Sequence, residues 1–327
     1  MLSHEGGILR EGQVTTTKAG MMEAFGAFGR ARIAIEVGTH SPWVSRLLRS
    51  LGHEIIVANP RQVKLITEST RKDDRLDAQT LARLARIDPA LLGPIQHRSE
   101  KAQTALMVIR VRAALLSARG LARSVGERLP KCDADQMGVP QTESLPPNVR
   151  QVLEPLLKEV ESLTEKIKES DHEIEQIARR DYPETALLEQ VSGVGPLIAL
   201  TFVLTVEDKD RFQKSRDIGC YVGLRPRRCD SGQSQPQLRI TKEGDPYLRT
   251  MLVEGAHYII SRRGPDTDLK RWGLHLTESG GKRGKKKAVV AVARKLGILL
   301  HRLWVTGEVY EPLRNHNLRQ ERKKIAA

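Results

Sequence analysis

The chain has 327 residues, and its 54 lysines and arginines against 40 aspartates and glutamates give a formal net charge of +14. This length allows two or three domains with buried cores, and the positive surplus favours a polyanionic partner such as nucleic acid. Three cysteines without CxxC spacing argue against a disulfide or zinc framework. The lack of a long apolar run and of a basic-then-apolar start predicts a cytoplasmic protein with no membrane partner.

The first hundred residues alternate between short apolar runs and helical spacing. Strands are expected at Ile8–Val14, as one arm of a hairpin after the Gly6-Gly7 turn, at Ala31–Ile35, which ends at Glu36, and at Glu54–Ala58. Helices are expected at Ser41–Leu51, from a cap at Asn59-Pro60 through Ile66, and at Lys72–Ile87. This order predicts a layered α/β domain over residues 1–98.

The middle part, residues 99–180, is predicted to be a helical connector. Ser99–Leu129 has helical spacing and many arginines, and 130–148 contains four prolines, which is typical of a linker. The apolar residues of Val149–Ala178 nearly follow a heptad seam: Leu153, Leu156, Val160, Leu163, Ile167, Ile174 and Ile177. The seam favours a coiled-coil-like pairing of helices, and the alternative is a single surface helix packed on its own domain.

The C-terminal part, residues 181–320, is expected to be mainly helical. Its expected elements are an apolar helix after Val191-Ser-Gly-Val-Gly195-Pro, a Gly/Ser/Gln-rich loop at Cys229–Gln237, a basic helix entry at Thr241–Leu252 and a basic helix at Lys285–Leu303. Gly193 and Gly195 permit a tight turn with N–H groups exposed at a helix start, which suits phosphate binding by a helix-hairpin-helix-like element. The alternative is an ordinary glycine turn.

Three carboxylates in the N-terminal part have the pattern of a metal site. Asp74 and Asp77, three residues apart near a helix start, project from one face, and a divalent cation is the usual compensation for such paired charges. Glu36 ends a predicted strand, where α/β sheets commonly present functional groups. Together they could hold Mg²⁺ or Mn²⁺ for attack on a phosphodiester. The alternative is that Asp73, Asp74 and Asp77 only favour the helix dipole.

A second candidate site is the loop around Ser231. A serine in a Gly-containing loop could attack phosphate, and Arg239, Lys242 and Arg249 follow it. Arg239 and Lys242 would stabilise charge that develops on the phosphoryl oxygens. An ordinary surface loop is the alternative. The run Lys282–Lys287, with Lys285 and Lys286, is either a solvated basic patch or a source of non-specific DNA affinity.

Several ordered motifs resemble one known family, from about residue 5 to 310. The N-terminal ones are Ile35-Glu36-Val-Gly-Thr-His-Ser-Pro-Trp43, Val57-Ala-Asn-Pro60 and Lys72-Asp-Asp-Arg-Leu-Asp77-Ala78. The C-terminal ones are Val191–Pro196, Tyr221-Val-Gly-Leu-Arg-Pro226, Ser231-Gly232, Arg239-Ile-Thr-Lys-Glu-Gly-Asp245 and Ala291-Val-Ala-Arg-Lys-Leu296. These motifs are similar to those of the DEDD-type insertion-sequence transposases, which are related to Piv-type DNA invertases and include bridge-RNA-guided recombinases.

The resemblance implies an RNase H/RuvC-like N-terminal domain whose four acidic residues bind Mg²⁺, three of them matching Glu36, Asp74 and Asp77. It also implies a C-terminal domain whose nucleophilic serine, best matched by Ser231, forms a transient phosphoserine link to DNA. The helix at about 149–178 would join the domains and assist formation of a dimer or tetramer. The further partner that it implies is a structured non-coding guide RNA that pairs with target and donor DNA.

One departure from the family pattern concerns the first acidic residue. The family has an aspartate on its first strand, whereas this chain has no aspartate before Asp73. Ile8–Val14 would then lack its upstream partner strand, and Glu5 lies on the wrong side of that strand to replace the aspartate. A sheet without its first strand has an unpaired edge, so a truncated reading frame or a late assigned start is expected.

These observations predict a mobile-element DNA transposase or site-specific recombinase that cleaves and exchanges double-stranded DNA. Metal-assisted and serine-nucleophile phosphoryl transfer would carry out the reaction. Two alternatives remain: a catalytically disabled DNA- or RNA-binding relic of the family, and a metal-only, structure-specific nuclease in which Ser231 is merely structural.

Overall fold

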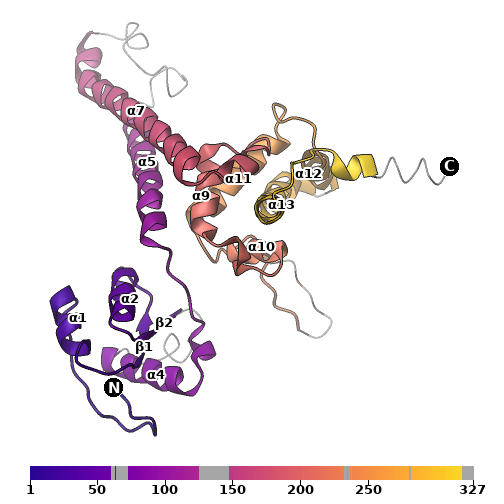
Figure 1. Ribbon diagram of the computed structural model, residues 1–327. Helices are drawn as coiled ribbons and strands as arrows, with labels where there is room; N and C mark the ends of the chain where they lie inside the picture. Colours follow the sequence, from indigo (N-terminus) through magenta and orange to yellow (C-terminus); the bar gives the residue numbers. More distant parts are fainter. Residues whose placement is uncertain are drawn as a thin grey trace. The chain divides into compact units, whose positions relative to one another are not determined.

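The computed structural model describes residues 1–59, 63, 73–124, 147–231, 234, 236, 238–279 and 281–318. The chain forms two compact units, Met1–Ser99 and Glu100–Ala327 (Figure 1). The unit that begins at Glu100 contains both the segment expected as a connector and the segment expected as a C-terminal domain. The helix expected from Pro60 through Ile66 and most of the linker at 130–148 lie outside the described residues.

The N-terminal unit contains a small parallel sheet with helices. Its elements are α1 (Lys18–Phe25), β1 (Arg32–Glu36), α2 (Ser41–Ser50), β2 (Glu54–Ala58), α4 (Asp74–Ile87) and a 3-10 turn, η1 (Pro89–Leu92). β1 pairs with β2 in parallel, and Glu36 lies opposite Ala58. The strands predicted to end at Glu36 and Ala58 and the helices predicted around α2 and α4 are therefore confirmed.

The two strands lie between α2 and α4 (Figure 1). Because strand side chains alternate between faces, Ile56 and Ala58 point the same way, and they form a buried cluster with Leu81 and Ala85 of α4. α2 contacts both strands and buries Val44 and Leu48 on its inner face. The sheet is thus covered on both faces, as parallel sheets generally are.

The prediction of a strand at Ile8–Val14 is wrong. Only Ile8 pairs, in a single antiparallel bridge to Leu2, and the segment 9–15 has no regular structure. The turn at Gly6-Gly7 does form, because Gly6 N–H donates to the Ser3 carbonyl and Ser3 N–H to the Gly7 carbonyl. No described strand lies beside residues 9–14, so their backbone has no ladder to join. The short helix α1 was not predicted.

The second unit is helical. Its elements are α5 (Glu100–Ser124), α7 (Pro147–Asp181), α8 (Thr185–Glu189), α9 (Pro196–Val206), η3 (Lys209–Arg211), η4 (Ser215–Asp217), α10 (Ile218–Tyr221), α11 (Pro246–Ile260), α12 (Asp268–Ser279), η5 (Gly281–Arg283) and α13 (Gly284–Thr306). The helix expected at Thr241–Leu252 begins instead at Pro246, because the Asp245 carboxylate caps it by accepting from the N–H groups of Tyr247 and Leu248. α12 was not predicted.

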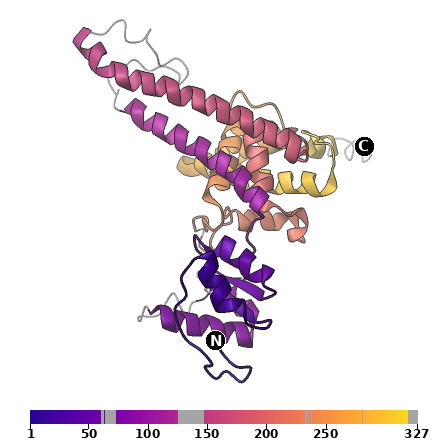
Figure 2. The same cartoon turned by 60° about the vertical axis from the view of Figure 1, so that its left-hand side comes forward.

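The predicted apolar seam of α7 packs on α5 of the same chain. The two helices lie side by side in both views (Figures 1 and 2), and Val160, Leu163, Ile167 and Ile174 are buried. The Arg112 guanidinium of α5 donates two hydrogen bonds to the Asp171 carboxylate of α7. The seam therefore makes a helix pair within the chain, and Ile174 continues into a cluster with Leu200 and Leu204 of α9.

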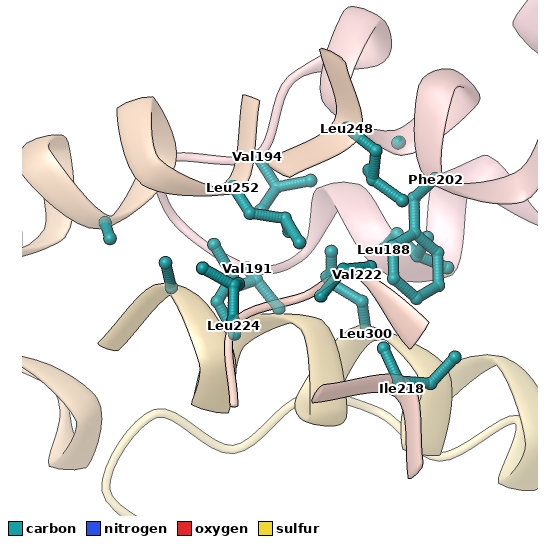
Figure 3. Packing of buried hydrophobic residues seen from close by; sticks show 14 of the residues in the cluster. Leu188, Val191, Val194, Phe202, Ile218, Val222, Leu224, Leu248, Leu252 and Leu300 are labelled. Carbon is teal, nitrogen blue, oxygen red and sulfur yellow. The ribbon is translucent and has the colours of Figure 1, made fainter. Parts of the chain in front are cut away.

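The main core lies between α9, α11 and α13 (Figure 3). Phe202 of α9, Leu252 of α11 and Leu300 of α13 are fully buried there. α9 buries residues all round, as a helix without a polar face must. None of the described helices has the length and apolar character needed to cross a bilayer.

A histidine inside this unit generates a prediction on stability. The ring of His301 bridges the Ser215 hydroxyl and the Lys209 carbonyl, both at 2.9 Å, and burial lowers its pKa from the usual 6.5. On acidification the unfolded chain takes up the proton at His301 first, so the free energy of unfolding falls as pH drops below about 6.5. Urea unfolding at a series of pH values should show this loss.

The variant His301→Gln should be less stable at neutral pH and should lack this part of the pH dependence. His257→Gln, on the exposed side of α11, is the matched control and should keep it. An unchanged pH dependence in His301→Gln would contradict the assignment.

Candidate functional site

Asp74 and Asp77 lie on the face of α4 that packs against the sheet. Leu81 follows Asp77 by one helical turn and Asp74 by two, so the three side chains share one side of the helix. Leu81 and Ala85 are buried against β2, whereas Asp74 is exposed and Asp77 is half-buried. The two carboxylates therefore continue the inner face of α4 beyond the end of its apolar contacts.

Glu36 lies at the same end of this unit. Nη1 of Arg32, at the start of β1, donates to the carbonyl of Ala85 near the end of α4, at 3.2 Å, so the start of the strand lies beside the end of the helix. Asp77 precedes Ala85 by about 12 Å of helix at about 1.5 Å per residue. Glu36 follows Arg32 by about 13 Å of strand at about 3.3 Å per residue. Glu36 also shares its face of the sheet with Ala34, Ile56 and Ala58, which is the face that α4 covers.

The structure distinguishes these carboxylates from their acidic neighbours. Asp73 is the N-cap of α4, and its Oδ1 accepts from Arg75 N–H at 2.9 Å, so the capping alternative holds for Asp73. Glu11 forms an ion pair with Arg75 at 2.5 Å and a hydrogen bond with Gln79. These partners lie on the other side of the helix from Asp74 and Asp77.

Asp74 and Asp77 have no hydrogen bond or ion pair among the described side chains. Nevertheless, within the part of the chain that the structure describes, no group of three or more His, Cys, Asp or Glu residues is arranged to hold a metal ion. Glu36, Asp74 and Asp77 are thus carboxylates of suitable chemistry at one end of the sheet that do not form a coordination site. Their role as metal ligands remains a prediction.

Gly193 and Gly195 lie in the turn between α8 and α9. Gly193 has a φ of +91°, and a Cβ there would lie 2.9 Å from Cδ1 of Tyr258 and 3.1 Å from the Gly255 carbonyl. Gly195 is the N-cap of α9, and nothing lies within 4 Å of its Cβ position. Close packing on α11 therefore requires the first glycine, whereas the second leaves the helix start open.

Ser231 lies at the tip of a hairpin formed by the described residues between 223 and 242. Ser231 and Ser234 exchange backbone hydrogen bonds at 3.1 and 2.9 Å across the tip. Nearer the base, Pro226 pairs with Ile240, and Thr241 N–H donates to the Arg225 carbonyl at 2.9 Å. The Ser231 side chain is exposed, and among the described residues its hydroxyl has no hydrogen-bond partner.

The base of this hairpin is closed by two glycines with positive φ. Gly223 has a φ of +68° and Gly244 one of +76°. A Cβ on Gly223 would collide with the Glu243 carbonyl, and one on Gly244 with the Tyr221 carbonyl. Nη1 of Arg249 adds donations to the carbonyls of Val222 and Glu243, at 3.1 and 2.9 Å. Arg249, predicted to bind DNA, thus holds the base of the hairpin.

Beside the hairpin is a basic hollow that was not predicted from the sequence. Its volume is about 380 Å³, and its lining residues are Cys220, Arg225, Arg227, Arg228, Thr241 and Glu243. The run Arg225-Pro-Arg-Arg228, just before the Ser231 loop, was the available signal. Arg239 and Lys242 are exposed on the returning arm, and Lys242 has a φ of +59°, which is uncommon for a side chain of this size.

Two further predicted contacts, Lys285 and Lys286, are exposed in the first turn of α13. Three of the predicted elements of the second unit therefore present accessible groups: the turn at Gly195, the hairpin arm with Arg239 and Lys242, and the start of α13. Cations and helix N-termini of this kind are the groups with which proteins contact phosphate backbones.

Two regions of the chain are similar to known transposases. A DEDD-type IS110 transposase model matches residues 1–123, and a model described as "Transposase IS116/IS110/IS902 family" matches residues 185–270. These matches support an IS110/IS116 family transposase. The second match contains the Gly193–Gly195 turn and the Ser231 hairpin, and the first contains Glu36, Asp74 and Asp77. A DEDD transposase domain implies an RNase H-like fold and suggests use of a divalent metal.

Curated relatives agree over most of the chain. The chain is 29% identical to the transposase for insertion sequence element IS1111A of Coxiella burnetii, over 81% of this chain and 75% of the relative. It is 26% identical to a probable family 20 transposase of Pseudomonas aeruginosa, over 86% of each. It is 27% identical to the putative transposase y4pF/y4sB of Sinorhizobium fredii, over 85% of this chain and 74% of the relative. Processing of DNA during transposition is the activity that such a family implies.

The hairpin base generates a prediction on both stability and activity. Gly244→Ala adds a Cβ that collides with the Tyr221 carbonyl, so we expect destabilisation of about 2 kcal/mol or more and loss of any DNA processing that depends on this hairpin. Gly307→Ala is the control, because Gly307 also has a positive φ but nothing within 4 Å of its Cβ position. It should cost only about 1 kcal/mol. Equal effects on unfolding would contradict the close contact at the hairpin base.

Proposed function

We propose that the chain is an insertion-sequence transposase in which Ser231 is the nucleophile for DNA strand cleavage and exchange. The observation that supports this most is the exposed serine at the tip of a hairpin whose arms carry a basic hollow. Arg225, Arg227 and Arg228 line this hollow, and guanidinium groups are suited to the planar, bidentate recognition of phosphate. A phosphodiester bound there would contact the same hairpin whose tip carries the Ser231 hydroxyl.

The step itself is an exchange of one phosphate ester for another. Oγ of Ser231 forms a bond to phosphorus, the bond from phosphorus to a deoxyribose oxygen breaks, and the serine proton ends on that leaving oxygen. The product is a phosphoserine link to one DNA end and a free hydroxyl on the other. Attack by the hydroxyl of a new DNA end reverses the chemistry and joins the strands. Arg239 and Lys242 would stabilise the charge on the phosphoryl oxygens.

The proposal assigns Glu36, Asp74 and Asp77 to binding Mg²⁺ or Mn²⁺. Such an ion, when bound, would polarise a phosphoryl oxygen and offset its negative charge. Support comes from the position of the three carboxylates at one end of the sheet and from the lack of partners for Asp74 and Asp77 among the described side chains.

The proposed partner is double-stranded DNA. Its backbone would contact Gly193 and Gly195 at the start of α9, Arg239 and Lys242 on the hairpin, and Lys285 and Lys286 on α13. Arg249 would act through the hairpin base that it holds. The proposal also includes a structured guide RNA that selects the DNA sites. The chain would assemble into a dimer or tetramer.

Replacement of the proposed nucleophile gives the direct test. Ser231→Ala should lower strand exchange on a plasmid with insertion-sequence ends by at least about 1000-fold, because alanine has no oxygen that can bond to phosphorus. Ser234→Ala changes the partner residue across the same turn and should retain activity within a few fold. If strand cleavage survives in Ser231→Ala, the chain is instead a nuclease that uses metal alone.

The carboxylates are tested separately by substitutions that keep their shape. Asp74→Asn and Asp77→Asn should each lower Mg²⁺-dependent activity by about 100-fold, since an amide is a weaker ligand for a hard cation. Asp73→Asn removes the same charge from the same turn but preserves the N-cap, so activity should remain within a few fold. If all three variants lost the same share of activity, the loss would come from the changed charge at the start of the helix. That result would contradict metal binding.

A further inference from the structure

The N-terminal unit contains a second group of cations, away from the carboxylates. Arg46 and Arg49 are three residues apart on α2, so they project from neighbouring positions of one helix side. Neither lies on the apolar face of α2, which is buried through Val44 and Leu48. α2 and α4 cover opposite faces of the sheet (Figure 1). These arginines are therefore on the other face from Asp74 and Asp77.

A second segment brings His97 and Arg98 to the same region. Ile95 N–H donates to the Val57 carbonyl at 2.9 Å, and the two residues form an antiparallel bridge. This bridge fixes the chain beside β2, with which α2 is also in contact. Helix α2, strand β2 and the segment around Ile95, which are distant in sequence, thus lie together. His97 comes directly after this segment.

Two polar atoms in this group are buried without a partner. Nη1 of Arg46 and Nε2 of His97 are inaccessible to solvent and have no hydrogen bond among the described residues. A buried polar atom without a partner destabilises the fold. Burial, together with the positive charges of Arg49, Arg46 and Arg98, lowers the pKa of His97. An arginine cluster beside His97, with Nη1 of Arg46 and Nε2 of His97 unsatisfied, is an arrangement that a bound anion stabilises.

We propose that Arg46, Arg49, His97 and Arg98 bind a phosphate group of a nucleic-acid backbone. Phosphate fits better than a carboxylate because its oxygens can accept from several donors that converge from α2 and from the 95–98 segment. The net charge of +14 favours the same class of ligand. The site goes beyond the proposed cleavage chemistry, since it lies in the N-terminal unit and neither Ser231 nor a metal takes part.

The test uses Arg49→Gln in the full chain, because Arg49 is exposed and its replacement leaves the packing of α2 intact. Fluorescence anisotropy with a short DNA duplex, and separately with a single-stranded RNA, is measured without divalent ions over a series of salt concentrations. We expect binding about 5- to 10-fold weaker and a log–log salt slope smaller by about one. Arg83→Gln, an exposed arginine of α4, removes the same charge and should bind within twofold of the unaltered protein.

A second measurement examines the site itself. In protein with ¹⁵N-labelled histidine, addition of inorganic phosphate or of the duplex should shift the ring-nitrogen signals of His97, and Arg49→Gln should weaken this response. Weaker binding of both polymers supports a shared phosphodiester site, and weaker binding of one assigns the site to that polymer. Arg49→Gln binding equal to that of Arg83→Gln, with an unchanged salt slope, would overturn the proposal. Ser231→Ala should bind normally, so failure of the cleavage mechanism is a distinct result.

Discussion

The position of the candidate nucleophile, Ser231, depends on a close backbone contact at two glycines. A residue with a Cβ atom would not fit at either of them. At Gly223 and Gly244 the two ends of the Ser231 hairpin come together so closely that a Cβ on either would overlap a carbonyl of the opposite segment. Arg249 ties the carbonyls of Val222 and Glu243 on the two sides. Val222 and Leu224 are buried in the core of the second unit (Figure 3). An exposed serine on a loop is thereby attached to a fixed helical scaffold, which is the usual arrangement for functional loops.

In the N-terminal unit, strand register and helix periodicity position the candidate residues. Its two parallel strands are covered by α2 and α4. The register places Glu36 opposite Ala58, so the two residues lie on the same face of the sheet. Asp74 and Asp77 continue the inner side of α4, so the same periodicity that buries Leu81 directs them toward the end of the sheet. The carboxylates and the cations of α2 then belong to opposite faces of one small sheet.

Much of this architecture could be predicted from the residues. Alternation and apolar runs located β1 and β2, and the 3.6-residue period located α2, α4, α7 and α13, because local patterns carry that information. The strand expected at Ile8–Val14 failed because a strand needs a partner, which a local pattern does not show. The start of α11 was placed too early because Gly244 and the Asp245 cap outweigh the apolar spacing before Pro246.

Some of the candidate functional residues could likewise be predicted from the sequence, and others could not. Asp74, Asp77 and Ser231 were recognisable from residue type, spacing and family resemblance, whereas the structural use of Asp73 and Arg249 depends on contacts that only the fold creates. The arginine-lined hollow arises because the two arms of the hairpin pair, which brings Thr241 beside Arg225. The unpartnered nitrogens of Arg46 and His97 come from elements about fifty residues apart, so no local pattern could have predicted them.

The central claim is that Ser231 becomes covalently attached to DNA. The protein would be incubated with DNA that carries the insertion-sequence ends and Mg²⁺, denatured rapidly, digested with nuclease and protease, and analysed by mass spectrometry. We expect a nucleotide joined through phosphate to the peptide that contains Ser231. Cleaved DNA without any such adduct, or an adduct on a different residue, would contradict it.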